Sequence, residues 1–167
     1  MQAKGGRKEM DIRLRTAEAE DAARLNEMQV RSFMPVSEKY DDREGSPAYE
    51  TIDRTLERIT SRHSVCHIIL ADGIYAGMIC VRALGGGVYK ISPAFVLPDF
   101  QNKGIAQKAF RLLDEIYPDA VLWTLATIRE EARNCHLYEK LGYVKTGSER
   151  KINEKMTIIG YERRIFK

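Results

Sequence analysis

Residues 96–106 read VLPDFQNKGIA and contain the end of a strand, a turn and the start of a helix. Pro98 and Asp99 are turn residues that end the apolar run before them. From Ile105, apolar side chains recur at positions i, i+4, i+7, i+8 and i+11, which predicts a helix over 105–116. A strand that leads directly into a helix is typical of α/β proteins, so this stretch decides the fold class.

The start of that helix is a candidate anion site. The first turn of a helix has backbone N–H groups without a partner and the positive end of the helix dipole. Gly104 and Ala106 are small enough for a ligand to approach this backbone, and Lys103 adds a cation. The segment from Asp99 to Arg111 has a net charge of +2, which suits phosphate or pyrophosphate. The spacing alone fits a tight connection with a solvated basic face as well, because such short patterns recur by chance.

A second informative stretch is 134–143, which reads NCHLYEKLGY. Asn134 and Tyr138 are four residues apart and share one face of the predicted helix, so both can point at one ligand. A tyrosine in that position can act as a general acid. The alternative is that Tyr138 is a core residue and Asn134 is simply exposed. Cys135 and His136 are adjacent and point in different directions, so we do not expect them to act as a pair.

The rest of the chain predicts alternating strands and helices. The expected strands are 12–15, 65–71, 74–84, 88–97, 121–127, 143–146 and 156–166, and the other expected helices are 19–33, 47–62 and 130–141. Hairpins predict antiparallel pairing, and the strand–helix–strand order of the second half predicts parallel pairing, so the sheet is expected to be mixed. Pro93 cannot donate to a ladder and predicts an edge or a bulge.

Composition places the chain among ordinary globular proteins. It has 167 residues, of which 44% are apolar and 31% charged, which predicts one domain and excludes collagen-like or wholly disordered chains. No apolar run approaches the roughly 18–20 residues of a membrane helix, so no membrane partner is expected. The net charge is only +3, and residues 1–10 contribute +2 of it. We therefore expect 1–10 to be a flexible leader, 11–167 to be a single domain, and no nucleic-acid partner.

The three cysteines are widely spaced and form no CxxC pair, so no metal site is expected. Cys66 and Cys80 lie in apolar runs and are interpreted as small core residues. With no apolar signal segment, the default location is the reducing cytoplasm.

Together, the two stretches resemble those of the GCN5-related N-acetyltransferase (GNAT) superfamily. Its members have a strand ending in Val-x-Pro, an Arg/Gln-x-x-Gly-x-Gly/Ala turn into a helix, another strand, and a helix with Asn and Tyr before Leu-Gly-Phe/Tyr. The matching residues, in the same order, are Val96-Leu97-Pro98, Gln101 to Ala106, 121–127, Asn134, Tyr138 and Leu141-Gly142-Tyr143. The resemblance extends over 11–166, with Gln101 in place of the commoner Arg and Ala106 in place of the commoner Gly.

The resemblance implies a fold of the α/β (α+β) class. Its single mixed, largely antiparallel sheet would be flanked by helices, with two central parallel strands that splay apart around acetyl-CoA. Backbone groups at Phe95 and Val96 would bind the pantetheine arm, and Asn134 would contact it as well. The pyrophosphate would lie on the turn formed by Gln101, Asn102, Lys103, Gly104, Ile105 and Ala106.

The implied reaction moves an acetyl group from acetyl-CoA to a primary amine by direct attack in a ternary complex. Tyr138 would protonate the leaving thiolate, and the Val96 N–H would stabilise the oxyanion. The strand before the turn has no carboxylate to act as the base. Candidates by region only are Glu38, Asp41, Asp42, Glu44 and His63, with a water chain as the alternative.

The acceptor is expected to be a small-molecule or peptide amine, and the protein a monomer or a homodimer. The segment from Glu38 to Glu57 has a net charge of −4, which suggests a cationic acceptor or, alternatively, a solvated helix face. Two other functions remain open. One is a non-catalytic acyl-CoA-binding regulatory module, and the other is nucleic-acid binding by the basic residues of 140–167.

Overall fold

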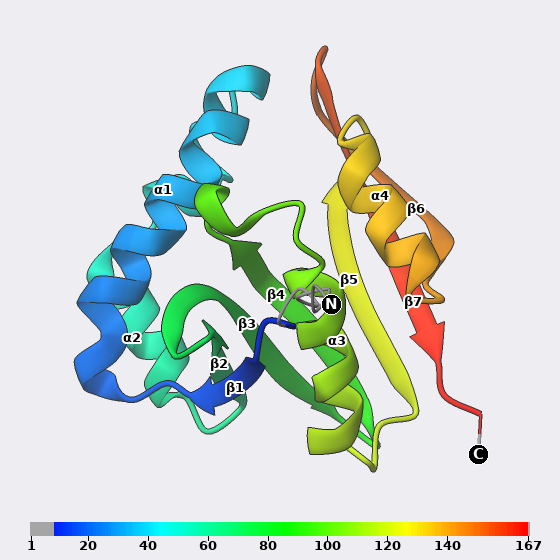
Figure 1. Cartoon of the computed structure of the whole chain (residues 1–167). Helices are drawn as coiled ribbons and strands as arrows, with labels where there is room; N and C mark the ends of the chain where they lie inside the picture. Colours follow the sequence, from blue (N-terminus) through cyan, green and yellow to red (C-terminus); the bar gives the residue numbers. More distant parts are fainter. Residues whose placement is uncertain (1–8, 167) are drawn as a thin grey trace, which may run out of the picture.

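A single seven-stranded sheet forms the centre of the computed structural model, which describes residues 9–166. The strands lie in the order β1-β2-β3-β4-β5-β7-β6, and only β4 and β5 pair in parallel (Figure 1). Their bounds are β1 Ile12–Thr16, β2 Ser64–Ala71, β3 Ile74–Gly85, β4 Val88–Val96, β5 Leu122–Ile128, β6 Val144–Asn153 and β7 Met156–Arg164. The mixed, largely antiparallel sheet predicted for this chain is therefore confirmed.

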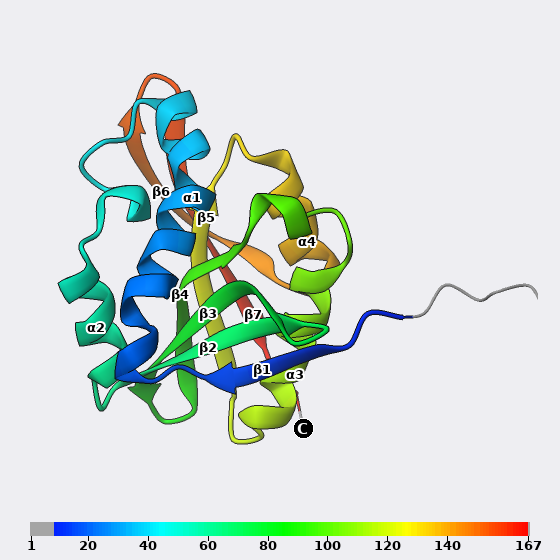
Figure 2. The same ribbon diagram turned by 60° about the vertical axis from the view of Figure 1, so that its left-hand side comes forward.

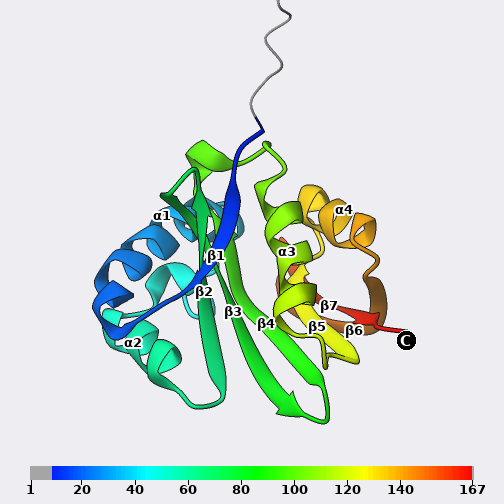
Figure 3. The ribbon, with the colours of Figure 1, turned by 60° about the horizontal axis from the view of Figure 1, so that its bottom comes forward.

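Helices cover both faces of the sheet. Helices α1 (Ala22–Tyr40) and α2 (Ile52–Thr60) lie on one face, whereas α3 (Ile105–Ile116) and α4 (Ala132–Lys140) lie on the other (Figures 1 and 3). Three short 3-10 helices precede α1, α2 and α3, and they are η1 (Ala19–Asp21), η2 (Pro47–Tyr49) and η3 (Pro98–Phe100). The core has two parts, one under each helical layer, and the larger one lies under α3.

Two predicted helices differ from the observed ones. Helix α1 continues past Phe33 to Tyr40 with Pro35 inside it, although a proline usually weakens a helix interior. Ser46 caps η2 rather than a long helix, because its side chain accepts from the Ala48 N–H. Helix α2 begins only at Ile52, where Thr51 Oγ1 accepts from the Arg54 N–H at 3.1 Å.

The charged segment after Thr146, which we expected to be a loop, belongs to strand β6. This edge strand pairs with β7 through Asn153, and a bulge around Gly147 interrupts its ladder. Every residue from Val144 to Arg150 is exposed, so the side chains on both faces of the strand contact solvent. A strand that buries neither face has no alternation of apolar residues, which is why the pattern did not predict it.

The central parallel pair separates along its length. Strands β4 and β5 pair only from Val88 to Lys90, and beyond Lys90 they diverge in the V that Figure 1 shows. Ser92 and Pro93 form a bulge, because Val81 pairs with Ile91 whereas Ile79 pairs with Ala94. The bulge that Pro93 predicted is therefore confirmed, and it lies where the two strands begin to separate.

Cys66 and Cys80 are directly opposite each other on β2 and β3 and form a disulfide. Both are buried, so their place in the core is confirmed, but the interpretation as unpaired core residues is wrong. They are 14 positions apart in sequence, and the hairpin register brings them together. Cys135 is the remaining, free cysteine.

Residues 1–8 of the expected leader lie outside the described part of the chain. Glu9 and Met10 belong to it as well, and both contact the folded domain. The described chain enters the sheet through β1, beside β2 (Figure 2). Glu9 accepts from Lys108 Nζ at 2.9 Å, and Met10 packs against the larger core cluster. Within 9–166, no helix is both long and apolar enough to cross a membrane.

Candidate active site

The end of β4 presents unpaired backbone groups to the gap beside β5. The Leu97 N–H donates to the Ala76 carbonyl oxygen at 2.8 Å. Because hydrogen bonding alternates along an antiparallel strand, Phe95 also faces β3, whereas Ala94 and Val96 direct their N–H groups into the gap. The sequence predicts that backbone groups of Phe95 and Val96 bind the ligand. The geometry supports Val96 and identifies the Ala94 N–H as a second donor at this edge.

The turn after β4 holds the start of α3 open to ligand. Asn102 and Gly104 both adopt the left-handed conformation, with φ of 65° and 75°. A side chain at Gly104 would meet no atom within 4 Å, so the backbone here is accessible. The first bond within the helix runs from the Lys108 N–H to the Gly104 carbonyl, which leaves the preceding N–H groups without helical partners. Gln101 turns back and donates from Nε2 to the Val96 carbonyl at 3.0 Å.

The cations near this turn differ in their availability. Lys108 is paired with Glu9. Lys103 makes no ion pair in the part of the chain that the structure describes, and its Nζ lies 5.8 Å from the centre of the Phe100 ring. Lys103 is therefore free to face an anion at the helix start.

Tyr138 lies on α4, in a cluster of aromatic rings on the side of the sheet that α3 covers. Its ring is 5.7 Å from Phe110 and 6.0 Å from both Tyr143 and Tyr161, measured between centroids. Burial raises the pKa of the Tyr138 phenol to about 12, so the hydroxyl keeps its proton at neutral pH. Val96 and Tyr138 are both partly buried and pack against the larger core cluster, on the side of the sheet that α3 covers.

Asn134 is exposed one helical turn before Tyr138, as the shared helix face predicted. Cys135 points elsewhere, with its Sγ 3.8 Å from the Ile128 carbonyl oxygen. His136 is exposed, and no interaction joins it to Cys135 among residues 9–166. The expectation that these neighbours do not form a catalytic pair agrees with this arrangement.

A set of hydrogen bonds connects the end of α1 to the far side of the gap. Tyr40 donates to Glu131 Oε1 at 2.7 Å, and Lys39 Nζ contacts the same oxygen at 2.9 Å. Asn153, at the tip of the β6–β7 hairpin, donates to the Tyr40 carbonyl at 2.7 Å. Sequence reasoning missed these residues because they are 91 to 113 positions apart and carry no motif.

Burial favours a higher pKa for the Glu131 carboxyl, but the hydrogen bonds from Tyr40 and Lys39 outweigh it and lower that pKa. Glu131 is therefore ionised and engaged at neutral pH. It is a structural link rather than a free base.

The acidic segment 38–57 carries less free charge than its sequence suggests. Three of its carboxylates are in ion pairs, namely Asp41 with Lys155, Glu50 with Arg58, and Glu57 with Arg54. The Lys155 ammonium lowers the pKa of Asp41. Asp42 Oδ1 accepts from the Gly45 N–H at 3.2 Å. Of the regional base candidates within 9–166, Asp41 is therefore held in an ion pair and Asp42 in a hydrogen bond to the backbone.

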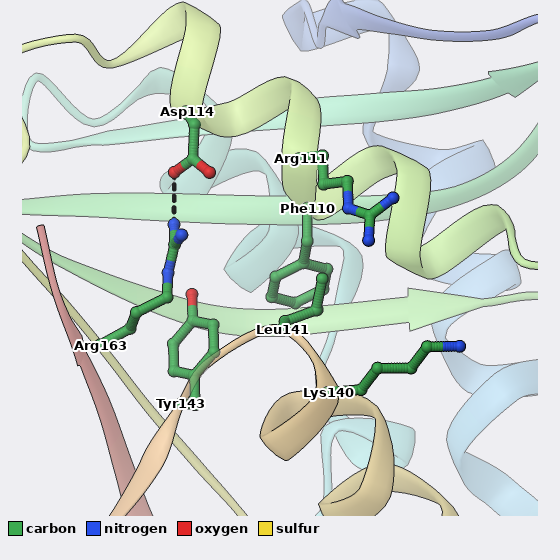
Figure 4. A pocket seen from close by; sticks show the side chains of 7 residues that line it. All are labelled: Phe110, Arg111, Asp114, Lys140, Leu141, Tyr143 and Arg163. Carbon is green, nitrogen blue, oxygen red and sulfur yellow. Dashed lines mark hydrogen bonds and ion pairs between the residues drawn. The ribbon is translucent and has the colours of Figure 1, made fainter.

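A cavity of about 180 Å³ opens between α3, the end of α4 and β7 (Figure 4). Three cationic side chains line it, from Arg111, Lys140 and Arg163. Arg163 is ion-paired with Asp114, whereas Arg111 and Lys140 make no ion pair within 9–166. This side of the molecule therefore offers positive charge beyond the helix start itself.

Comparison with known protein families identifies the family of this chain. The family model described as Acetyltransferase (GNAT) family matches residues 23–143. This chain belongs to the GNAT acetyltransferase family.

One curated relative of this GNAT protein is YrkN from Bacillus subtilis (strain 168). It is 29% identical over 118 residues, which are 65% of this chain and 59% of YrkN. The chain thus matches less than two thirds of that relative's length.

Solved structures share the fold over nearly the whole chain. One is the ribosomal-protein-S18-alanine N-acetyltransferase from Escherichia coli, with a TM-score of 0.74, 14% identity, and coverage of 93% of this chain and 94% of that one. Another is the spermidine N-acetyltransferase from Vibrio cholerae in complex with CoA and spermine, with a TM-score of 0.72, 19% identity, and coverage of 92% and 95%. A third is yncA, a putative acetyltransferase from Salmonella typhimurium with acetyl-CoA, with a TM-score of 0.70, 18% identity, and coverage of 95% of each chain. At these identities the likeness shows the fold alone.

Proposed function

We propose that this protein is an acetyl-CoA-dependent N-acetyltransferase that acts by direct attack of a primary amine in a ternary complex. The observation that supports the proposal is the gap that opens between β4 and β5 beyond Lys90, because hydrogen-bond alternation along β4 directs the Val96 N–H away from β3 and into this gap. A binding module would need the gap and the turn, but it would not need a protonated phenol beside them.

The residues at the turn suit the diphosphate of the cosubstrate. Gly104 leaves the approach open, and the N–H groups at the start of α3 are unpartnered. Arg111 and Lys140, which line the cavity in Figure 4, add positive charge on the α3 side of the sheet, and Lys103 adds a cation in the turn itself. Val96, Ala94 and Asn134 would hold the pantetheine arm along the gap.

The reaction forms a C–N bond and breaks a C–S bond. The acceptor amine, with a pKa near 10, must first lose a proton, which we assign to a water because the described part of β4 carries no carboxylate. The Val96 N–H donates to the oxyanion of the tetrahedral intermediate. Tyr138 then donates its proton to the departing thiolate, so that free CoA thiol leaves and the phenol is reprotonated from solvent.

The acceptor is an amine whose identity the site only partly restricts. The structural neighbours include enzymes described as acting on spermidine and on a ribosomal protein. Both kinds of substrate present a primary amine, which is the chemistry proposed here.

Release of CoA thiol from acetyl-CoA over a broad panel of primary amines tests the proposal. We expect amine-dependent release that is accompanied by acetylated amine in mass spectra. Tight binding of acetyl-CoA with no release for any amine would instead support the non-catalytic acyl-CoA-binding module.

A further inference from the structure

Two cations lie directly opposite each other where β4 and β5 begin to separate. Arg82 on β3 pairs in register with Lys90 on β4, and Lys90 in turn pairs with Thr124 on β5. Paired residues on neighbouring strands point to the same face of a sheet. Lys90 is also the last residue of β4 that pairs with β5, so this cation marks the base of the gap.

The face that carries Arg82 and Lys90 is opposite to α3 and Tyr138. The neighbours Tyr89 and Ile91 pack into the core on the α3 side, so Lys90 points to the other side. The core cluster on that other side contains residues of α1, β2, β3 and β4 but no residue of β5 or β7. Helices α1 and α2 therefore leave this half of the face uncovered.

An alanine in the middle of the sheet shows how open this face is. Ala126, in the central strand β5 and on the same face as Thr124, is exposed, as are Lys90 and Ser92. Ala126 pairs with Gly160, and side chains of Thr146 and Ser148 lie over Gly160, so Ala126 is the small residue exposed beyond the last β4–β5 pair. An acceptor can therefore reach the gap from this face, while the turn and Tyr138 occupy the opposite face.

The charges of Arg82 and Lys90 are not neutralised by a nearby carboxylate within 9–166. Neither Arg82 nor Lys90 makes an ion pair in the described chain, and like charges directly opposite each other on a sheet are destabilising. Glu162 lies in the same row, but it is two strands from Lys90 and 3.9 Å from Arg164 Nε. A bound anion would relieve this repulsion, and no carboxylate of segment 9–166 does so.

We propose that Arg82 and Lys90 bind an anionic group of the acceptor, so that the preferred substrate is an amine bearing a carboxylate or phosphate several bonds from its nitrogen. This inference rests on the proposed acetyltransferase function and names the class of acceptor for the same site. It departs from the cationic acceptor that the acidic segment 38–57 suggested, because three carboxylates of that segment are already in ion pairs.

The geometry sets the spacing between the two groups of the acceptor. Ala94 and Val96 pair with Ile79 and Gly77 on β3. Arg82 is three positions from Ile79 and five from Gly77 along the same strand. At about 3.4 Å per residue, these correspond to roughly 10–17 Å along the strand. The long side chains of Arg82 and Lys90 shorten the distance that the acceptor must span. An ω-amino acid, or a peptide N-terminus followed closely by an acidic residue, fits this spacing better than an α-amino acid.

Matched amines of one length test the inference. Thiol release is measured with 6-aminohexanoate, hexylamine and 1,6-diaminohexane, which differ only in the charge of the far end. We expect kcat/KM to be highest for 6-aminohexanoate. Lys90→Met and Arg82→Met should each lower that value about tenfold or more and change the value for hexylamine less than about twofold. Lys90→Glu places a carboxylate opposite Arg82, so the two should pair and the preference for 6-aminohexanoate should disappear.

The control variant is Lys145→Met on the edge strand β6. Lys145 is exposed and pairs with Tyr161, so it lies on the other face and should leave all three substrates unchanged. Because Arg82 and Lys90 are exposed and repel each other, their variants should unfold at urea concentrations no lower than the wild type. Equal kcat/KM for the three amines, or equal losses for charged and neutral amines in the variants, would overturn the inference while the acetyltransferase function stands. Failure of every amine to release thiol would overturn both.

Discussion

The hydroxyl of Tyr40 donates a 2.7 Å hydrogen bond to Glu131 Oε1 and so joins the end of α1 to the start of α4. Helix α1 packs on β2 to β4, whereas α4 follows β5, so the bond links the two halves of the sheet where β4 and β5 are apart. The hydroxyl is buried and the carboxylate is ionised, which makes this a charge-assisted bond.

Tyr40→Phe removes this bond and leaves Glu131 with one partner fewer. We expect a loss of about 1–3 kcal/mol in the free energy of unfolding, because hydrogen bonds to charged groups contribute that much. Urea unfolding followed by circular dichroism gives the value. The matched control is Lys39→Met, which removes a more exposed contact to the same oxygen and should cost less than Tyr40→Phe. Equal losses in the two variants would mean that the phenol adds nothing beyond surface charge pairing.

Much of the fold followed from local sequence signals, and the parts that did not follow have physical reasons. Helix 105–116 has a strong apolar stripe and was predicted with the bounds observed. Strand β6 has no stripe because it buries neither face. The Cys66–Cys80 bond depends on hairpin register, which spacing alone does not define.

The candidate site divides in the same way. The turn at 101–106 and the Tyr138 helix are continuous in sequence and could be recognised as motifs. The Tyr40–Glu131 bond and the pairing of Arg82 with Lys90 arise from contacts between distant segments. Whether the Ala94 N–H points into the gap depends on which neighbours along β4 bond to β3. The bulge at Ser92 and Pro93 shifts that alternation, so the sequence alone does not define it.

Tyr138→Phe should remove the proton donor for the departing thiolate. We expect kcat to fall by about 10²–10⁴ while the affinity for acetyl-CoA stays the same, since the ring still packs in its cluster. Because burial raises the pKa of the phenol to about 12, wild-type turnover should show no loss from Tyr138 ionisation below pH 10. Steady-state kinetics and calorimetric titration with acetyl-CoA separate the two effects.

The matched control for Tyr138→Phe is Tyr161→Phe. Tyr161 lies in the same ring cluster, but its hydroxyl contacts Glu139 at 3.3 Å. That variant should lose stability rather than turnover. Unchanged turnover in Tyr138→Phe would remove Tyr138 from the role of acid.

The Cys66–Cys80 disulfide predicts how many free thiols the protein contains. In denaturant without a reductant, one thiol per chain should react with Ellman's reagent, and it should map to Cys135 by peptide mass spectrometry. After reduction, all three cysteines should react. Opening a loop of this size costs about 3 kcal/mol in the chain-entropy account, so the reduced protein should unfold at lower urea. Three reactive thiols before reduction would contradict the pairing of Cys66 with Cys80.

His67 gives the fold a pH dependence with a defined sign. It is buried on β2, where Nε2 lies 2.7 Å from the Tyr117 hydroxyl, and burial lowers its pKa from 6.5 to about 4. Between these two values the unfolded chain binds a proton that the folded chain does not, so stability is present above pH 6.5 and is lost as pH falls toward 4. The loss amounts to at most about 3 kcal/mol. His67→Gln keeps a polar partner for Tyr117 and does not titrate, so its unfolding free energy should fall less between pH 7 and pH 4 than that of the wild type. Urea melts at pH 7, 6, 5 and 4 compare the two slopes, and parallel slopes would show that other groups control the acid stability of this protein.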